Sequence, residues 1–159
     1  MFQLIEKELG PIEENSSMVR VIDGTWPLYM LIHYILNIVG PSNITLTSFT
    51  FSEAAIRHLL FLKDEGLIKQ LTGIFDNGNR RTKSPLLYFA NEVFDNLRLS
   101  ANHSKITVIE NAKFPISIIT SMNLSQNKRI ENLTIDTRAE TFIYLQNKIA
   151  DLYQNSIDI

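Results

Sequence analysis

Two short polar pairs flank apolar, β-branched runs in the second half of the chain. His103 and Lys105 stand one residue apart at the start of "KITVIE", and Ser121 and Asn123 repeat that spacing after "FPISIIT". Side chains two residues apart point to the same face of a strand, so each pair can face one ligand. A histidine beside donor groups can act as a nucleophile or a general acid. The pattern is therefore either ordinary turn chemistry or an active site.

The two runs stand close enough in the sequence to form a hairpin. Residues 105–110 and 114–120 read as strands, and only "NAK" links them, which predicts an antiparallel pair. The start of the first strand then lies beside the end of the second, and the four polar side chains converge at one edge of the sheet. Glu131 follows eight residues after Asn123.

Strands and helices alternate through the rest of the chain. The expected elements are a helix at 26–39, a strand at 43–51, a helix at 53–66, a strand at 68–76, a loop at 77–83, a helix at 84–97, a strand at 129–136 and a helix at 138–154. This alternation, with the hairpin, predicts a three-layer α/β/α sandwich with a mixed β-sheet. We expect one domain at 25–159, preceded by a polar lead-in at 1–24.

Three helix starts carry recognisable signals. Ser52 precedes the second helix and is expected to cap it. Ser84 is expected to cap the next helix, with Pro85 at its first position. Thr137 and Glu140 have the spacing of a capping box at the start of the final helix.

Composition excludes several classes of protein. The chain has 159 residues, a net charge of −2 and no cysteine, so it offers no disulfide, no thiolate chemistry and no overall attraction to nucleic acid. The N-terminus lacks the pattern of a signal peptide. The longest apolar run, "WPLYMLIHYILNIV", is shorter than the roughly 20 residues that span a bilayer. We expect a soluble, cytoplasmic protein that does not bind membranes.

The polar pairs resemble the motif of the phospholipase D superfamily, which is His-x-Lys, four residues and Asp, then Gly-Ser-x-Asn and a later Glu. The first half matches at His103 and Lys105, and the second half as "TSMN" with Glu131 after it. Glu110 stands where the family has Asp, and Thr120 where it has Gly. The resemblance covers residues 25–155 and implies a phospholipase D-like fold.

The resemblance also implies a reaction. Family members cleave phosphodiesters without a metal or other cofactor, so we expect none here. His103 would attack phosphorus to form a phosphohistidine, while Lys105, Asn123 and Ser121 stabilise the phosphate oxygens. Glu131 would accept a hydrogen bond from a histidine ring, and Glu110 would have a supporting role.

Only one His-x-Lys is present, yet the leaving oxygen needs a second histidine as acid. Members with a single motif pair two chains around one shared site, so the resemblance implies a homodimer. The substitutions at Glu110 and Thr120 leave an alternative open: a catalytically weakened module that binds nucleic acid or phosphate without turnover.

The substrate class also follows from analogy. Single-motif members of this length are more often nucleases than lipases, which favours nucleic acid, and DNA rather than RNA. Arg80, Arg81 and Lys83 in the 77–83 loop, with Lys128, are candidates for a phosphate track, although loop charges are equally typical of a solvated turn. A group of aromatic residues falls at core spacing, and we interpret it as core rather than as stacking platforms: Phe49, Phe51, Phe61, Tyr88, Phe89 and Phe94.

Overall fold

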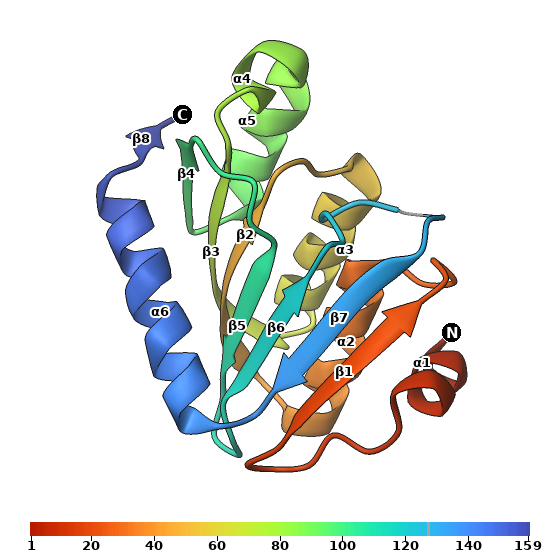
Figure 1. The fold of residues 1–159 in the computed structure, drawn as a ribbon. Helices are drawn as coiled ribbons and strands as arrows, with labels where there is room; N and C mark the ends of the chain where they lie inside the picture. Colours follow the sequence, from red (N-terminus) through yellow and green to blue (C-terminus); the bar gives the residue numbers. More distant parts are fainter. Residues whose placement is uncertain (127) are drawn as a thin grey trace.

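One mixed β-sheet runs through the molecule (Figure 1). The computed structural model describes residues 1–126 and 128–159. The strands are β1 Ser17–Ile22, β2 Ser42–Ser48, β3 Ile68–Asp76, β4 Asn96–Ser100, β5 Ile106–Glu110, β6 Ile116–Thr120, β7 Glu131–Asp136 and β8 Ile157–Asp158. The helices are α1 Phe2–Leu9, α2 Leu28–Val39, α3 Glu53–Asp64, α4 Asn79–Thr82, α5 Ser84–Val93 and α6 Ala139–Gln154.

The order of strands confirms the expected α/β fold with a mixed sheet. The eight strands lie in the order β1-β7-β6-β5-β2-β3-β4-β8. β2, β3 and β4 are parallel, and β5, β6, β7 and β1 pair antiparallel. The predicted hairpin is present, because β5 pairs antiparallel with β6. The carboxyl ends of the parallel strands therefore share one sheet edge with the start of β5 and the end of β6.

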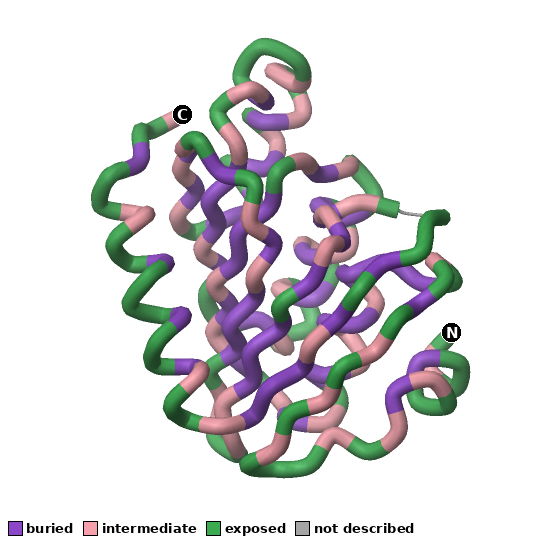
Figure 2. The backbone as a smooth tube through the Cα atoms, in the orientation of Figure 1, coloured by how far each residue is buried: buried purple, intermediate pink, exposed green. Residues whose placement is uncertain are grey.

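Helices cover the two faces of the sheet unequally. The larger core lies between the sheet and α2, α3 and α5. Figure 2 shows buried stretches in the strands and on part of these helices. On the other face, α6 packs Phe142, Leu145 and Ile149 onto Ile74 and Val108. α6 lies across only part of that face and leaves β7 and β1 without a covering helix (Figure 1).

The sequence signals of α2 and α3 agree with the structure. α2 buries seven of its residues, in agreement with an apolar run on most of its faces. α3 begins after Ser52, whose hydroxyl accepts a hydrogen bond from the Ala55 N–H. Gly66 follows this helix at φ +73°, a conformation that glycine adopts without strain.

The expected helix at 84–97 is too long. α5 ends at Val93, and the chain from Asn96 to Ser100 forms β4. Asp95 accounts for the change, because its carboxylate accepts the Leu71 N–H of β3 at 2.7 Å and the Lys63 ammonium at 2.9 Å. These bonds hold Asp95 beside β3, and the chain that follows it forms a strand.

Three other local predictions are wrong. Ser84 lies inside α5 rather than capping it, since Lys83 is the N-cap residue. The capping box does not form: the Thr137 hydroxyl donates to the Glu13 carbonyl, and α6 begins after Arg138. The 77–83 segment contains α4 instead of being a loop throughout. At Thr137 a tertiary partner replaces the local bond that the sequence suggests. At Ser84 the helix begins one residue earlier than predicted.

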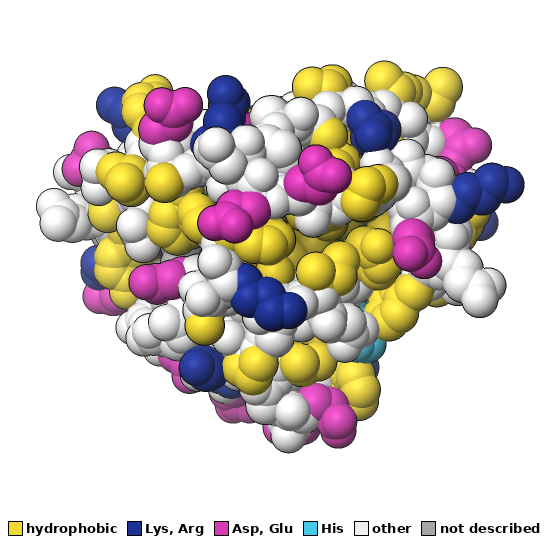
Figure 3. Space-filling view, turned by 90° about the horizontal axis from the view of Figure 1, so that it is seen from below, with side chains coloured by type: hydrophobic (Ala, Val, Ile, Leu, Met, Phe, Trp, Pro, Cys, Tyr) yellow, Lys and Arg dark blue, Asp and Glu magenta, His cyan; other side chains and the backbone are white. Residues whose placement is uncertain are grey.

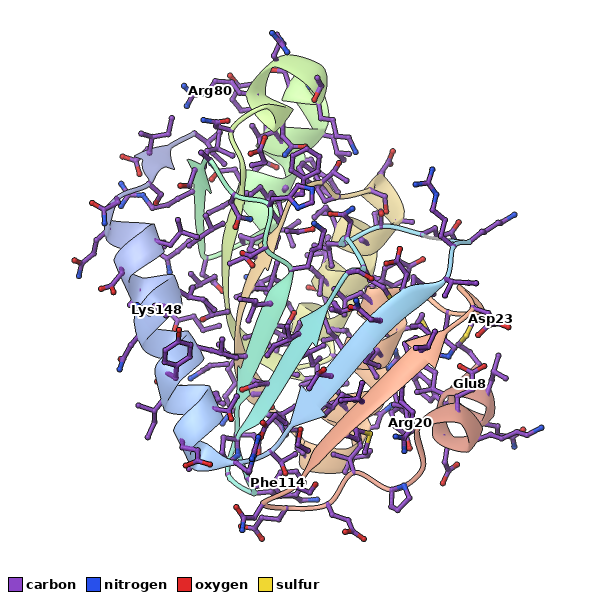
Figure 4. The ribbon with its side chains drawn as sticks, in the orientation of Figure 1. Glu8, Arg20, Asp23, Arg80, Phe114 and Lys148 are labelled. Atoms are coloured by element: carbon purple, nitrogen blue, oxygen red, sulfur yellow. The ribbon has the colours of Figure 1, made fainter. Side chains whose placement is uncertain are left out.

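Residues 1–24 contain two elements that the sequence did not predict. α1 is followed by β1, which pairs with β7 along its full length. Arg20 on β1 donates to the carbonyls of Glu8 and Leu9 and so holds the end of α1 beside the sheet (Figure 4). These carbonyls lack helical partners, and a cation suits that end of a helix.

No helix in the described ranges 1–126 and 128–159 is long and apolar enough to cross a membrane.

Candidate functional site

The segment that carries His103 is held on both sides by side-chain hydrogen bonds. The Asn102 N–H donates a hydrogen bond to the carboxylate of Asp76, the last residue of β3, at 3.2 Å. The hydroxyl of Ser104 lies 2.8 Å from that of Thr47 on β2. His103 therefore stands on a backbone that is fixed to both neighbouring parallel strands.

Lys105 lies directly against His103. Its Nζ is 3.2 Å from the His103 Nδ1 and donates to the His103 carbonyl at 2.6 Å. The residue is only 8% exposed, and this burial lowers the pKa of the ammonium, while Glu131 acts in the opposite direction. An anionic ligand would stabilise the charged lysine, so the position suits a phosphate.

Asn123 reaches the same place from the end of β6. Its Oδ1 accepts the Thr50 N–H at 3.3 Å, and the Leu124 N–H donates to the Ser48 hydroxyl at 2.9 Å. These bonds join the segment after β6 to the segment after β2. Because the oxygen of the Asn123 amide is engaged, the group that it offers to a ligand is its NH2, a donor that suits a phosphate oxygen.

Ser121 is used to hold Glu131. Its hydroxyl donates to the Glu131 carboxylate and accepts the Asn132 N–H at 3.0 Å. Within the described chain no hydrogen bond joins Glu131 to His103. The serine thus fixes the carboxylate at the start of β7, next to the pocket.

Thr120 occupies the position at which the phospholipase D motif has glycine, and its backbone is not strained. Among the described non-glycine residues, only Asn15 has a positive φ. The Thr120 hydroxyl donates to the Asn132 carbonyl at 2.6 Å and accepts the Met122 N–H at 3.1 Å. The side chain that replaces glycine therefore links β6 to β7.

The five expected catalytic residues line one polar pocket of about 410 Å³. Its lining consists of His103, Lys105, Ser121, Asn123, Ser125, Gln126, Arg129 and Glu131. The pocket combines an imidazole, an ammonium, a guanidinium, two amides, two hydroxyls and one carboxylate. Such a set can bind a phosphate group and offer it a nucleophile.

Glu110 lies away from this pocket. It is the last residue of β5, whereas His103 and Lys105 precede the first, and it stands opposite Asn43 at the far end of the strand pair. Its side chain is exposed. The glutamate at the position of the family aspartate therefore has no contact with the pocket.

The four basic residues of the expected phosphate track differ in their surroundings. Arg80 points outward from α4 and donates to the Asp158 carbonyl at 2.6 Å (Figure 4). Lys83 donates to the Phe51 carbonyl, and burial lowers its pKa, so this lysine supports the β2–α3 loop. Arg81 lines a second hollow beside the site, and Lys128 is exposed next to Arg129.

Phe49 belongs to the site region, although its spacing in the sequence predicts a core residue. Its ring centroid is 4.7 Å from that of His103, and the Lys105 Nζ is 5.7 Å from the ring centroid. It is 39% exposed, and Phe61 and Tyr88 are also exposed and not core, whereas Phe51 and Phe94 are buried as expected. The available signal was its position directly after β2, because ligands of α/β sheets bind outside the carboxyl ends of parallel strands.

The opposite end of the sheet has a different character. Figure 3, viewed from that end, shows Lys and Arg side chains interspersed with Asp and Glu around apolar groups.

The α/β fold is similar to that of phospholipase D family members, and structural comparison confirms this resemblance in the fold. Neither a protein-family profile nor a curated protein matches the sequence. NucT from Helicobacter pylori is similar over 91% of this chain and 100% of its own, with a TM-score of 0.67 and 12% identity. Nuc from Salmonella typhimurium, a phospholipase D family member, is similar over 91% and 99%, with a TM-score of 0.67 and 15% identity.

A third similar structure is that of a chromatin protein. TrmBL2, an archaeal chromatin protein with a novel mode of DNA binding, is similar over 99% of this chain and 58% of its own, with a TM-score of 0.58 and 13% identity. At these identities the likeness establishes the fold. The reaction must be argued from the site.

Proposed function

We propose that this chain is a metal-independent phosphodiesterase, and specifically a nuclease, that acts through a phosphohistidine intermediate at a site shared by two subunits. The observation that carries the proposal is the convergence of His103, Lys105 and Asn123 on one pocket. The first supplies a nucleophile, and the other two supply donors to phosphate oxygens.

The reaction has two displacements. A ring nitrogen of His103 attacks phosphorus, the bond from phosphorus to the leaving oxygen breaks, and a histidine from the other subunit protonates that oxygen. Water then attacks phosphorus, the phosphorus–nitrogen bond breaks, and the same second histidine takes the proton of the water. The Lys105 ammonium and the Asn123 amide stabilise negative charge on the non-bridging oxygens throughout.

The surroundings of the His103 ring support a role for Glu131. Attack by Nε2 requires the proton on Nδ1 and an acceptor for it, but within one chain Nδ1 lies beside the Lys105 amine. Glu131 is held at the pocket by Ser121 and is the acidic residue among the pocket-lining side chains. We propose that it accepts the Nδ1–H of the partner's His103 when two pockets meet.

An uncovered apolar area beside the pocket supports the homodimer. We call it the open face, and it consists of Val19, Val21, Ile106, Ile119 and Thr134. The strand registers place these residues on the α6 side of the sheet, where Val21 is 73% exposed and Ile119 39% exposed. A hollow of about 400 Å³ joins the open face to the site, because its lining includes Ile106, Ile119, His103 and Lys105.

The test is cleavage of single- and double-stranded DNA by the purified protein in excess chelator. We expect cleavage, and we expect His103→Ala to lower the rate by at least about 10³-fold, because it removes the nucleophile and the acid together. Lys148→Ala, an exposed lysine on α6, is the control and should cleave like the parent. Cleavage that survives His103→Ala would overturn the proposal.

The similarity to TrmBL2, a chromatin protein with a novel mode of DNA binding, favours one second candidate. This is a module that binds DNA through the pocket without turnover. This candidate predicts that neither the parent protein nor His103→Ala cleaves DNA, and that DNA binding weakens as the salt concentration increases.

A further inference from the structure

Phe49 presents a partly exposed aromatic ring on a rigid backbone. The buried side chain of Asn79 donates to the Phe49 carbonyl and to the Asp76 carbonyl, both at 2.8 Å. The next residue, Thr50, donates its N–H to Asn123. Hydrogen bonds from two other segments thus fix the backbone on both sides, while the ring remains 39% exposed.

Phe49 borders both the candidate site and a second hollow. Its ring contacts His103, which lines the pocket. Phe49 also lines a hollow of about 370 Å³, together with Thr50, Asp76, Gly78, Asn79, Arg81 and Thr82. The second hollow therefore offers a guanidinium and an aromatic side chain that contacts the histidine.

We propose that this second hollow binds one nucleotide of a single-stranded nucleic acid, with its base stacked on Phe49 and its phosphate bound by Arg81. The inference rests on the proposed function, because it assigns the nucleotide next to the phosphate held by His103. Stacking on an aromatic side chain needs a base whose face is free, and both faces are covered inside a duplex. Single strands are therefore the preferred substrate.

A contact with His103 could also mean that Phe49 only positions the histidine, and the substrate itself separates the two roles. We compare an intact single-stranded oligonucleotide with one that carries an abasic residue beside the scissile phosphate. For the parent protein, kcat/KM should fall roughly 5- to 150-fold on the abasic strand, the range expected for loss of one stacked base. Phe49→Leu should cause a similar loss on the intact strand and little further loss on the abasic one.

Two further variants complete the design. Phe49→Trp keeps an aromatic surface and should restore discrimination between intact and abasic strands. Tyr88→Leu removes an aromatic side chain that is 62% exposed on α5 and should change neither rate. If Phe49→Leu lowers kcat/KM by the same factor on both strands, the residue positions His103 and the inference fails while the nuclease stands.

The opposite case is also distinguishable. Binding of both oligonucleotides is measured with His103→Asn, which keeps a planar side chain against Phe49. If the parent cleaves nothing, but tighter binding of the intact strand is lost with Phe49→Leu in this background, the proposed nuclease fails and the stacking site stands. Equal affinity for both strands would overturn the stacking site.

Discussion

At the scale of single residues, Thr120 shows how the chain accommodates a departure from the phospholipase D motif. Its hydroxyl satisfies the Asn132 carbonyl and the Met122 N–H. We expect Thr120→Val to lower the free energy of unfolding by about 1–2 kcal/mol at nearly constant side-chain volume, because the Met122 N–H loses its acceptor and the Asn132 carbonyl keeps only the Ser121 N–H. Urea denaturation measures the change. Thr120→Ser keeps the hydroxyl and serves as the control, and equal stability of the valine variant would contradict the assignment.

At the scale of elements, α2 and α3 meet through a histidine pair that the proposed reaction does not use. The His33 Nδ1 lies 3.0 Å from the His58 Nε2. Burial lowers the pKa of both imidazoles, and His33 further lowers the pKa of His58. The unfolded chain therefore takes up protons first as the pH falls. Stability should be fully present above the unfolded value of about 6.5 and decrease below it.

This pH dependence is measured by urea unfolding between pH 7.5 and pH 5. His58→Gln should flatten the curve, because it removes one of the two titrating rings. Asp136, whose pKa is lowered to about 2, contributes stability that is lost only at much lower pH, so it does not interfere. A slope that is identical in the parent and in His58→Gln would assign the dependence to other groups.

At the scale of the whole molecule, the proposed site is complete only if two open faces meet. Ile119→Asp places a charge on that face, so it should convert a dimer at micromolar concentration into a monomer and abolish cleavage. The fold should tolerate the change because the side chain is already 39% exposed. Sedimentation equilibrium measures the state of assembly, and Tyr88→Asp on α5 is the control. A parent protein that is monomeric and active would exclude the shared site.

The order of elements was largely predictable because it rests on local patterns. The apolar run of α2, the Ser52 cap of α3 and the hairpin of β5 and β6 are encoded by neighbouring residues. β4 was missed because Asp95 binds a strand that is distant in the sequence, and β1 because its pairing partner is β7. Thr137 fits a capping box locally but bonds to Glu13 instead.

For the candidate site, spacing and motif identify the residues that could do chemistry. Alternation along paired strands fixes which side chains share an edge, and it predicts that the following residues converge: His103, Lys105, Ser121, Asn123 and Glu131. The surroundings of these residues are visible only in the folded chain. Phe49 contacts His103, and Glu110 lies outside the pocket. Lys83 donates a hydrogen bond to the Phe51 carbonyl in the loop between β2 and α3. These positions depend on contacts between segments far apart in the chain, which no local pattern specifies.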